Sequence, residues 1–291
     1  MSVTAQRVAA HRLTFDRIPA LYGDPAADEA LARDVAAAAG VAPGAMRDYL
    51  RARTRFFDAV VTGALGRGYP QVVIGGAGYD GRALRYAKPG VRWFEADHPA
   101  TQRDKRSRLH RLGIDSAHIR FVAADFTADP VADLLLSAGL DPHLPSLFLL
   151  EGVAVYLDRA VLQALLQHLR QIATDGSTLA ISLSVTTGTA DQDARRAAFL
   201  EAVAAVGEPA RSVLEAAGAG PFLEATGWRP AGPPELPGRA VRAGFLLARP
   251  GEPATADATP TEPRPRVSWR PGISRAGQAG PRRPSRAPVR R

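Results

Sequence analysis

Short apolar runs alternate with amphipathic segments along most of this 291-residue chain. Within each run the apolar residues are nearly continuous, which is typical of strands buried on both faces of a parallel sheet. Helices between such strands cover the two faces, so the pattern predicts an α/β fold. The predicted strands are Gln71–Ile74, Val91–Glu95, Ile119–Ala123, Ser146–Leu150, Thr178–Val185 and Val241–Ala248, and the clearest helices are Pro99–Leu112 and Ala160–Ala173.

Two flanking regions lack this alternation. Residues 1–66 include the Ala-rich segments Ser2–Ala20 and Asp28–Ala39 and predict a helical N-terminal cap, which leaves 67–250 as the α/β domain. Residues 251–291 hold nine Arg, eight Pro and three acids, so they carry a net charge of +6 and the rest of the chain only +2. Because few of their side chains are apolar, we predict a disordered tail. This tail either binds nucleic acid weakly or is a solvated extension.

Composition excludes several kinds of site. The chain has no Cys, which excludes disulfide bonds, thiolate metal sites and a cysteine nucleophile. Its six His show no metal-ligand spacing, and no G-x-S-x-G turn indicates a hydrolase. No run of 18 apolar residues appears, and the first residues lack the pattern of a secretory signal. We therefore expect a cytoplasmic protein without a bound metal or a membrane partner.

Four consecutive predicted strands end in residues that suit ligand binding. The first runs into a glycine turn at Gly75–Gly81, and the next three are followed by Asp97, Asp125 and Glu151. In open α/β sheets, ligands bind beyond the carboxyl ends of the strands. The sequence therefore predicts a binding site at this edge of the sheet.

These features match the parts of an adenosine. A glycine turn lets the backbone approach a ligand closely, because glycine has no Cβ and tolerates positive φ. Asp97 lies about 20 residues beyond the turn, where an acid can accept hydrogen bonds from ribose hydroxyls. Asp125 suits the exocyclic amine of adenine, and the backbone N–H of Phe126 suits a ring nitrogen.

An NAD(P)-dependent oxidoreductase is the main alternative, because Gly76–Gly81 also fits the G-x-G-x-x-G pattern of dinucleotide sites. Asp80 in the first turn would repel a pyrophosphate, and Arg82 would offset that repulsion only in part. An acidic site is better matched by a cation that carries no phosphate. S-adenosyl-L-methionine (SAM) combines an adenosine with a sulfonium charge, so we expect SAM as the cofactor.

Four stretches together resemble the leucine carboxyl methyltransferase-like family, and more closely its bacterial branch of SAM-dependent methyltransferases. They are QVVIGGAGYDGRALR at Gln71–Arg85, FEADHPATQRDKR at Phe94–Arg106, Phe121–Phe126, and LLEGVAVYL at Leu149–Leu157. The segment Arg51–Asp58 (RARTRFFD) is similar to the Arg-containing helix ahead of the family's glycine turn. The resemblance covers roughly residues 5–250. It implies a class I methyltransferase-like Rossmann fold, with a mainly parallel seven-stranded sheet whose last strand is antiparallel.

The resemblance also implies roles for individual residues and agrees with the ribose and adenine assignments made above. It places Gly76 against the methionine portion of SAM, with Gly78 in the same turn. It places Glu151 near the amino or sulfonium end and Arg53 at the carboxylate. Gly81 departs from the Thr that is usual in the family, and Phe126 from the common Leu.

Helical geometry singles out Arg53 independently of the resemblance. At 100° per residue, Arg53 lies at the centre of the apolar face of its helix, whereas Arg51 and Arg55 lie on the opposite face. A guanidinium on an apolar face is costly to bury without a partner. Arg53 therefore either extends its guanidinium to solvent, pairs with an acid in the core, or binds the cofactor carboxylate.

The expected reaction is methyl transfer to an oxygen of a small molecule. The strand-end motifs offer no obvious general base except His98, which Pro99 marks as the start of a helix. A carboxylate acceptor needs no base because it is ionised at neutral pH. We therefore predict methyl-ester formation on a small carboxylic acid, without assigning a catalytic residue. A non-catalytic ligand-binding protein, or one that binds nucleic acid through its tail, is a further alternative.

Overall fold

A single seven-stranded sheet, in the order β3-β2-β1-β4-β5-β9-β8, organises the chain. The computed structural model describes residues 3–37, 44–186, 210–232 and 244–251, with the backbone alone at 44–46. Strands β1 to β5 are parallel, and β9 is antiparallel to both β5 and β8. The strands are β1 Gln71–Gly75, β2 Arg92–Asp97, β3 Ile119–Ala123, β4 Ser146–Leu150, β5 Thr178–Ser182, β8 Trp228–Ala231 and β9 Phe245–Pro250. This is the predicted class I methyltransferase fold.

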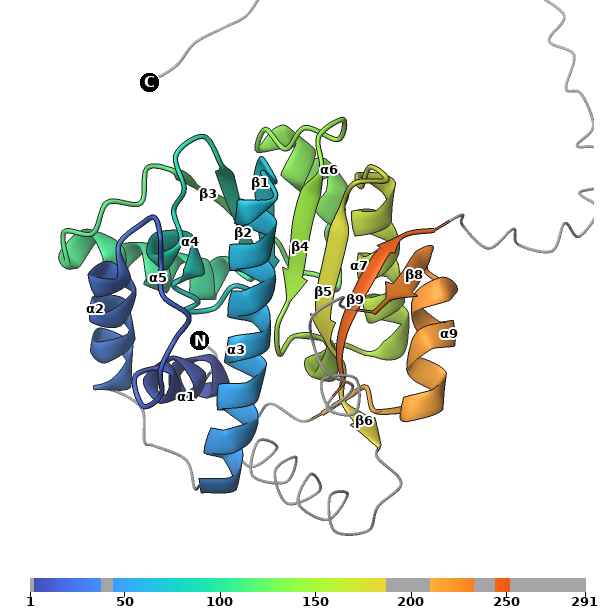
Figure 1. Cartoon of the computed structure of the whole chain (residues 1–291), viewed down its shortest axis with the longest axis horizontal. Helices are drawn as coiled ribbons and strands as arrows, with labels where there is room; N and C mark the ends of the chain where they lie inside the picture. The colour runs from blue at the N-terminus through green and yellow to red at the C-terminus, as the bar shows by residue number, and fades with distance from the viewer. Residues whose placement is uncertain (1–2, 38–43, 187–209, 233–243, 252–291) are drawn as a thin grey trace, which may run out of the picture. The chain divides into compact units, whose positions relative to one another are not determined.

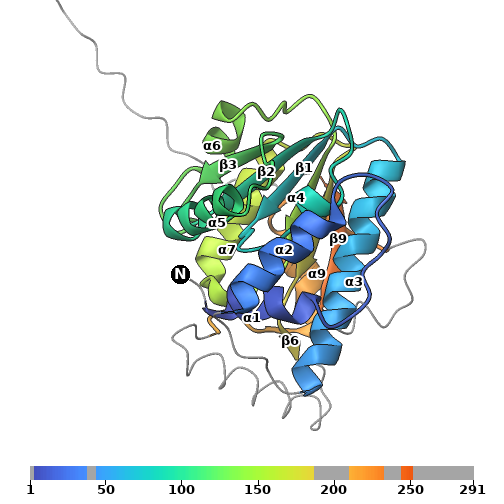
Figure 2. The same ribbon diagram turned by 90° about the vertical axis from the view of Figure 1, so that its left-hand side faces the viewer.

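Helices cover both faces of the sheet (Figures 1 and 2). One core cluster joins the sheet to the N-terminal helices and to the helices that follow β1 and β2, and a second joins it to the later helices. The first layer contains α1 Val3–Arg12, α2 Pro25–Ala36, α3 Gly44–Gly66, α4 Arg82–Arg85 and α5 Pro99–Arg111. The second contains α6 Val131–Ser137, α7 Arg159–Gln171 and α9 Ala219–Glu224. Short 3-10 turns lie at η1 Ala154–Tyr156 and η2 Ala216–Gly218, and β6 Val185–Thr186 pairs with β7 Leu214–Glu215.

The parallel register brings the carboxyl ends of the first four strands to one edge of the sheet. Gly75 at the end of β1 lies opposite Ala96 in β2, and Asp97 lies opposite Ala123 at the end of β3. Strand β4 pairs with β1 on the other side, so Glu151 directly follows a strand of the same central group. The glycine turn and the three acids therefore share one end of the sheet.

Helix α7 shows how the sequence produces one layer. Its leucine stripe, with Leu162, Leu165, Leu166 and Leu169, is buried against the sheet. Apolar side chains at this helical spacing form one face, and their burial drives the packing of the helix. Asp158 occupies the N-cap position, but its side chain makes no capping bond, and its Oδ2 lies 3.0 Å from Arg211 Nη1.

The predicted elements are shifted in a few places. Helix α1 ends at Arg12, although the prediction extended it to Ala20. Just beyond this end, the Thr14 hydroxyl donates to the carbonyl of His11. Helix α2 begins at Pro25, because Asp24 caps it through a 3.1 Å bond to the Ala27 N–H. Strand β8 was not predicted, since it contains Pro230, a residue that only an edge strand tolerates readily.

Parts of three predicted segments lie outside the residues that the structure describes. Residues 38–39 of the second predicted helix, residues 241–243 of the last predicted strand and residues 252–291 of the predicted tail lie outside the described part of the chain. No helix within the described ranges is long and apolar enough to span a membrane.

A buried ion pair links β2 to α5 beneath the glycine turn. Lys105 Nζ lies 2.6 Å from Glu95 Oε2 and donates to the carbonyl of Asp80 at 2.6 Å. Both side chains are almost fully buried, and Glu95 Oε1 has no hydrogen-bond partner among the described residues. Burial outweighs the effect of Lys105 and raises the pKa of Glu95 from 4.5 to about 7.

This raised pKa predicts a pH-dependent gain in stability from Glu95→Gln. Between pH 4.5 and 7 the folded wild type binds more protons than the unfolded chain, so its stability falls as the pH rises. Because Gln does not ionise, the stability of the variant does not fall with pH for this reason. The stability of Glu95→Gln relative to wild type should therefore rise across this window, by up to about 3 kcal/mol.

Urea unfolding of both proteins at pH 5, 6, 7 and 8 measures this difference. Glu224→Gln, at an exposed position, is the matched control and should alter stability by the same small amount throughout. A Glu95→Gln difference that does not vary with pH would contradict the prediction.

Candidate functional site

The glycine turn after β1 runs close to the end of β4. Gly76 and Gly78 have φ of +63° and +49°, a region that glycine adopts without strain. A Cβ on Gly76 would lie 2.0 Å from Val153 Cγ2, so any side chain there would displace the chain that follows β4. The turn thus requires glycine at position 76, and the positive φ favours glycine at position 78.

Asp97 is held in the turn by backbone donors. The Gly78 N–H donates to Oδ2 of Asp97, and the His98 N–H donates to Oδ1 at 2.6 Å. Burial raises the pKa of Asp97 in spite of these two bonds. Each carboxylate oxygen can still accept a further bond, so the side chain is fixed in place and remains able to bind a diol. His98 is the N-cap of α5, as predicted, and its Nδ1 accepts from the Ala100 N–H.

Asp125 and Phe126 follow β3 at the same edge. Thr127 donates to Asp125 Oδ1 from its N–H at 2.9 Å and from its hydroxyl at 2.6 Å, and these bonds lower the pKa of the carboxyl. The second oxygen, Oδ2, makes no hydrogen bond to the described residues. Phe126 is half-buried and packs against the core on the α6 and α7 side. Within the described chain, the Asp125 carboxylate bonds only inside its own turn.

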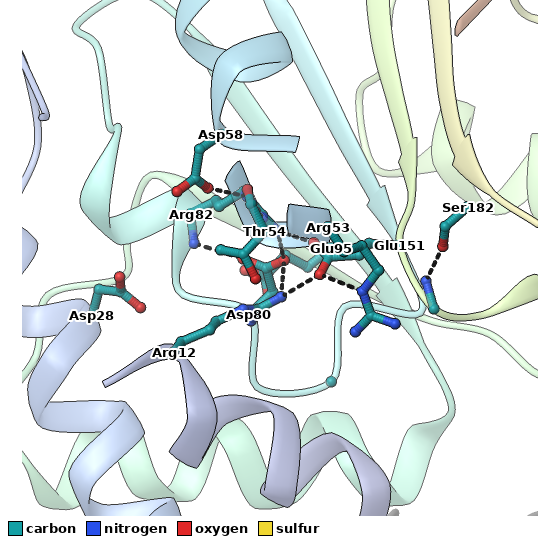
Figure 3. A network of polar contacts seen from close by, with 12 residues as sticks. Arg12, Asp28, Arg53, Thr54, Asp58, Asp80, Arg82, Glu95, Glu151 and Ser182 are labelled. Atoms are coloured by element: carbon teal, nitrogen blue, oxygen red, sulfur yellow. Dashed lines mark hydrogen bonds and ion pairs between the residues drawn. The ribbon is translucent and has the colours of Figure 1, made fainter. Parts of the chain in front are cut away.

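Glu151, directly after β4, lies within a cluster of arginines (Figure 3). Its Oε2 accepts from Arg82 Nη1 at 2.5 Å. Its Oε1 accepts from Arg53 Nε at 3.0 Å and lies 3.3 Å from Arg12 Nη2. Ser182 at the end of β5 supports this position, because its Oγ accepts from the N–H of Gly152 at 2.7 Å.

Arg53 is buried on α3, as the helical geometry predicts, whereas Arg51 and Arg55 are exposed. Its partner in the structure is an acid of the core, Glu151, and its guanidinium carbon lies 5.6 Å from the centre of the Tyr49 ring. Only Nε donates to Glu151, and neither Nη atom makes a hydrogen bond to the described residues. The planar pair of Nη groups is therefore available to an anion.

The sequence indicates Arg82 only as a charge beside the glycine turn, yet in the structure its side chain is completely buried. Its Nη1 lies 2.5 Å from both Asp80 Oδ2 and Glu151 Oε2, and its Nε lies 2.8 Å from Asp58 Oδ1. Arg12 was not predicted at all, because α1 offers no motif that would single it out. These arginines correct the expectation of an acidic site, because their positive charges balance the negative charge of the ionised Glu151 carboxylate.

The departure at Gly81 has a structural reason. A Cβ on Gly81 would lie 1.8 Å from Asp28 Oδ1 in α2. Asp28 is buried and bonds Arg17 Nη1 at 3.2 Å and Arg85 Nη1 at 3.1 Å. The carboxylate of Asp28 thus occupies the space beside residue 81 that a side chain would need, and it links α2 to α4.

The predicted residues therefore form three neighbouring groups at the carboxyl edge of the sheet. Gly76, Gly78 and Asp97 are joined through the glycine turn. Arg53 and Glu151 are joined by an ion pair. Asp125 and Phe126 follow the neighbouring strand, which pairs with β2 beside Asp97.

Comparison with known proteins identifies relatives of this chain. The family model of leucine carboxyl methyltransferase matches residues 6–170. A "Putative S-adenosyl-L-methionine-dependent methyltransferase" of Mycolicibacterium gilvum is 38% identical over 152 residues, 51% of this chain and 49% of that protein. One from Saccharopolyspora erythraea is 36% identical over 137 residues, 47% of this chain and 48% of that protein. The chain thus matches about half the length of these curated relatives.

A solved structure shares the fold over a longer span. A crystal structure of a "putative methyltransferase" from Thermobifida fusca superposes with a TM-score of 0.54 at 18% identity. That alignment covers 84% of this chain and 94% of the other. At 18% identity this structural similarity shows the fold alone. The family model, in contrast, matches more than half of the sequence. The chain therefore belongs to the leucine carboxyl methyltransferase family, as its four strand-end motifs predict.

Proposed function

We propose that this protein is a SAM-dependent methyltransferase that methylates a carboxylate oxygen of a small molecule. The observation that carries this proposal is the grouping of a glycine turn, Asp97, Asp125 and Glu151 at the ends of four neighbouring parallel strands. Ligands of open α/β sheets bind at this edge. The curated relatives bear names of SAM-dependent methyltransferases, which agrees with the proposal.

The residues present fit SAM part by part. Asp97 would accept the ribose hydroxyls, and Asp125 with the N–H of Phe126 would bind adenine. Gly76 and Gly78 would lie against the methionine portion. Arg53 would bind the cofactor carboxylate through its two Nη groups, and Glu151 would bind the ammonium through Oε1. When bound, SAM supplies a methyl group activated by the sulfonium charge.

A dinucleotide fits the same turn less well. A pyrophosphate needs backbone N–H donors and a positive charge at the glycine turn. Arg82, the cation nearest in sequence, is fully buried, and its donors are directed to Asp58, Asp80, Glu151 and the carbonyl of Thr54. Four of its five N–H donors already have protein partners, and its complete burial keeps the guanidinium away from a phosphate.

The side chains around the site favour an acceptor that is already ionised. His98 uses Nδ1 to cap α5, Lys105 is paired with Glu95, and the Tyr79 hydroxyl donates to Asp104 at 2.5 Å. A carboxylate oxygen can take the methyl group in line with the breaking carbon–sulfur bond without losing a proton. The protein would then contribute to the reaction by aligning the acceptor carboxylate with SAM and by excluding water.

Product analysis tests the acceptor class. The protein and SAM are incubated with a panel of small carboxylic acids, each paired with its alcohol and amine counterparts. We expect products that release methanol on mild alkaline treatment, as methyl esters do. Base-stable methylation of a hydroxyl or nitrogen would contradict the carboxylate assignment.

Arg53→Lys tests the assignment of the cofactor carboxylate. Lysine cannot present two coplanar donors while also bonding Glu151, so affinity for S-adenosylhomocysteine should fall roughly tenfold or more. Affinity for methylthioadenosine, which lacks the amino-acid end, should change little. Calorimetric titration measures both.

Two exposed arginines of the same helix are the controls. Arg51→Lys and Arg55→Lys should bind both ligands as wild type does, because these side chains lie on the opposite face of α3. Equal losses for both ligands in Arg53→Lys would show that Arg53 serves the fold.

A further inference from the structure

Arg82 contacts one carboxylate oxygen of Glu151, Oε2, whereas Arg53 contacts the other, Oε1. Arg82 belongs to α4, immediately after the glycine turn, and its side chain is 0% exposed. Its guanidinium joins three carboxylates from separate parts of the chain: Asp58 of α3, Asp80 of the turn and Glu151 after β4. Nη2 also donates to the carbonyl of Thr54 at 3.2 Å.

The two oxygens of Glu151 have different partners. Oε1 contacts Arg53 and Arg12, whereas Oε2 contacts Arg82. In the proposed function a bound amino-acid end places its ammonium at Oε1 and its carboxylate at Arg53. The Arg82 contact at Oε2 would stay in place, because Arg82 is enclosed by protein on all sides.

We infer that Arg82 is a positioning residue that fixes Glu151 in the orientation and charge needed to bind the cofactor ammonium. This inference rests on the proposed function and assigns a role to a residue that does not itself touch the ligand. The planar guanidinium of Arg82 donates to Asp58 of α3 through Nε and to Glu151 through Nη1. Because the guanidinium is held by Asp58 and lies next to the glycine turn, it fixes the rotation of the Glu151 carboxylate.

The charges around Glu151 agree with this role. Burial alone would raise the pKa of Glu151, but Arg82, Arg12 and Arg53 reverse that effect and lower it to about 2, against the opposing charge of Asp80. Arg82 is the strongest of these cations. Without it, Glu151 would depend on Arg53 and Arg12 alone.

Arg82→Lys and Arg82→Met test the inference through ligand selectivity. The ratio of S-adenosylhomocysteine affinity to methylthioadenosine affinity should fall roughly tenfold or more in both variants, because only the first ligand carries an ammonium for Glu151. In Arg82→Met the pKa of Glu151 should also rise. The affinity for S-adenosylhomocysteine should then fall from pH 8 to pH 5 more steeply than in wild type. The affinity for methylthioadenosine over the same pH range reports the effect of other titrating groups, because this ligand has no ammonium for Glu151.

Arg85 is the matched control, because it is a buried arginine of the same helix that pairs with Asp28 and not with Glu151. Arg85→Lys and Arg85→Met should leave the affinity ratio unchanged. Calorimetry at pH 5 to 8, with circular dichroism to verify folding, measures these quantities.

The outcomes separate the inference from the proposed function. A wild type that binds neither ligand would refute the proposed function itself. A wild type that binds both, with an unchanged ratio in folded Arg82 variants, would overturn the role of Arg82 alone. Loss of folding in Arg82→Lys but not in Arg85→Lys would also overturn it, since Arg82 would then serve the fold.

Discussion

A guanidinium group that is shielded from water must be surrounded by negative charge, and Arg82 meets this condition with Asp58, Asp80 and Glu151. Each of these carboxylates also contacts a second buried arginine (Arg17, Arg12 or Arg53), so removing one would leave two buried guanidinium groups with fewer anionic partners. The same ion pairs fix where α3, the glycine turn and the end of β4 meet. The geometry of the proposed cofactor site is thus set by a buried ionic contact as well as by the sheet.

The network extends from the site into the N-terminal helices. Arg17, in the segment between α1 and α2, binds Asp58 at 2.6 Å and Asp28 at 3.2 Å, and Asp28 in turn binds Arg85. Arg12 of α1 contacts Asp80 and Glu151 directly. The N-terminal helices therefore supply charged groups to the site, and they share a core cluster with the sheet.

The sequence was sufficient to predict six strands of the sheet and its carboxyl edge, because apolar strands and strand-end acids are local patterns. The periodicity of α3 also predicted that Arg53 is buried and that Arg51 and Arg55 are not. The network around Arg82 could not be predicted, because two of its three carboxylate partners, Asp58 and Glu151, are 24 and 69 residues away in the chain. Strand β8 was missed because Pro230 argues against a strand unless its edge position is already known.

These contacts bear on the ligand that we propose for the site. The strand-end acids alone favour a cation, but Glu151 is bonded to Arg82 and Arg53, with Arg12 close by. A lone cation at Glu151 would meet these arginines, and a lone anion would meet the carboxylates of Glu151 and Asp80. In the proposed function a zwitterion would satisfy both, with its ammonium on Glu151 and its carboxylate on Arg53. The arrangement therefore favours a free amino-acid group beside an adenosine, a combination that SAM provides and a dinucleotide lacks.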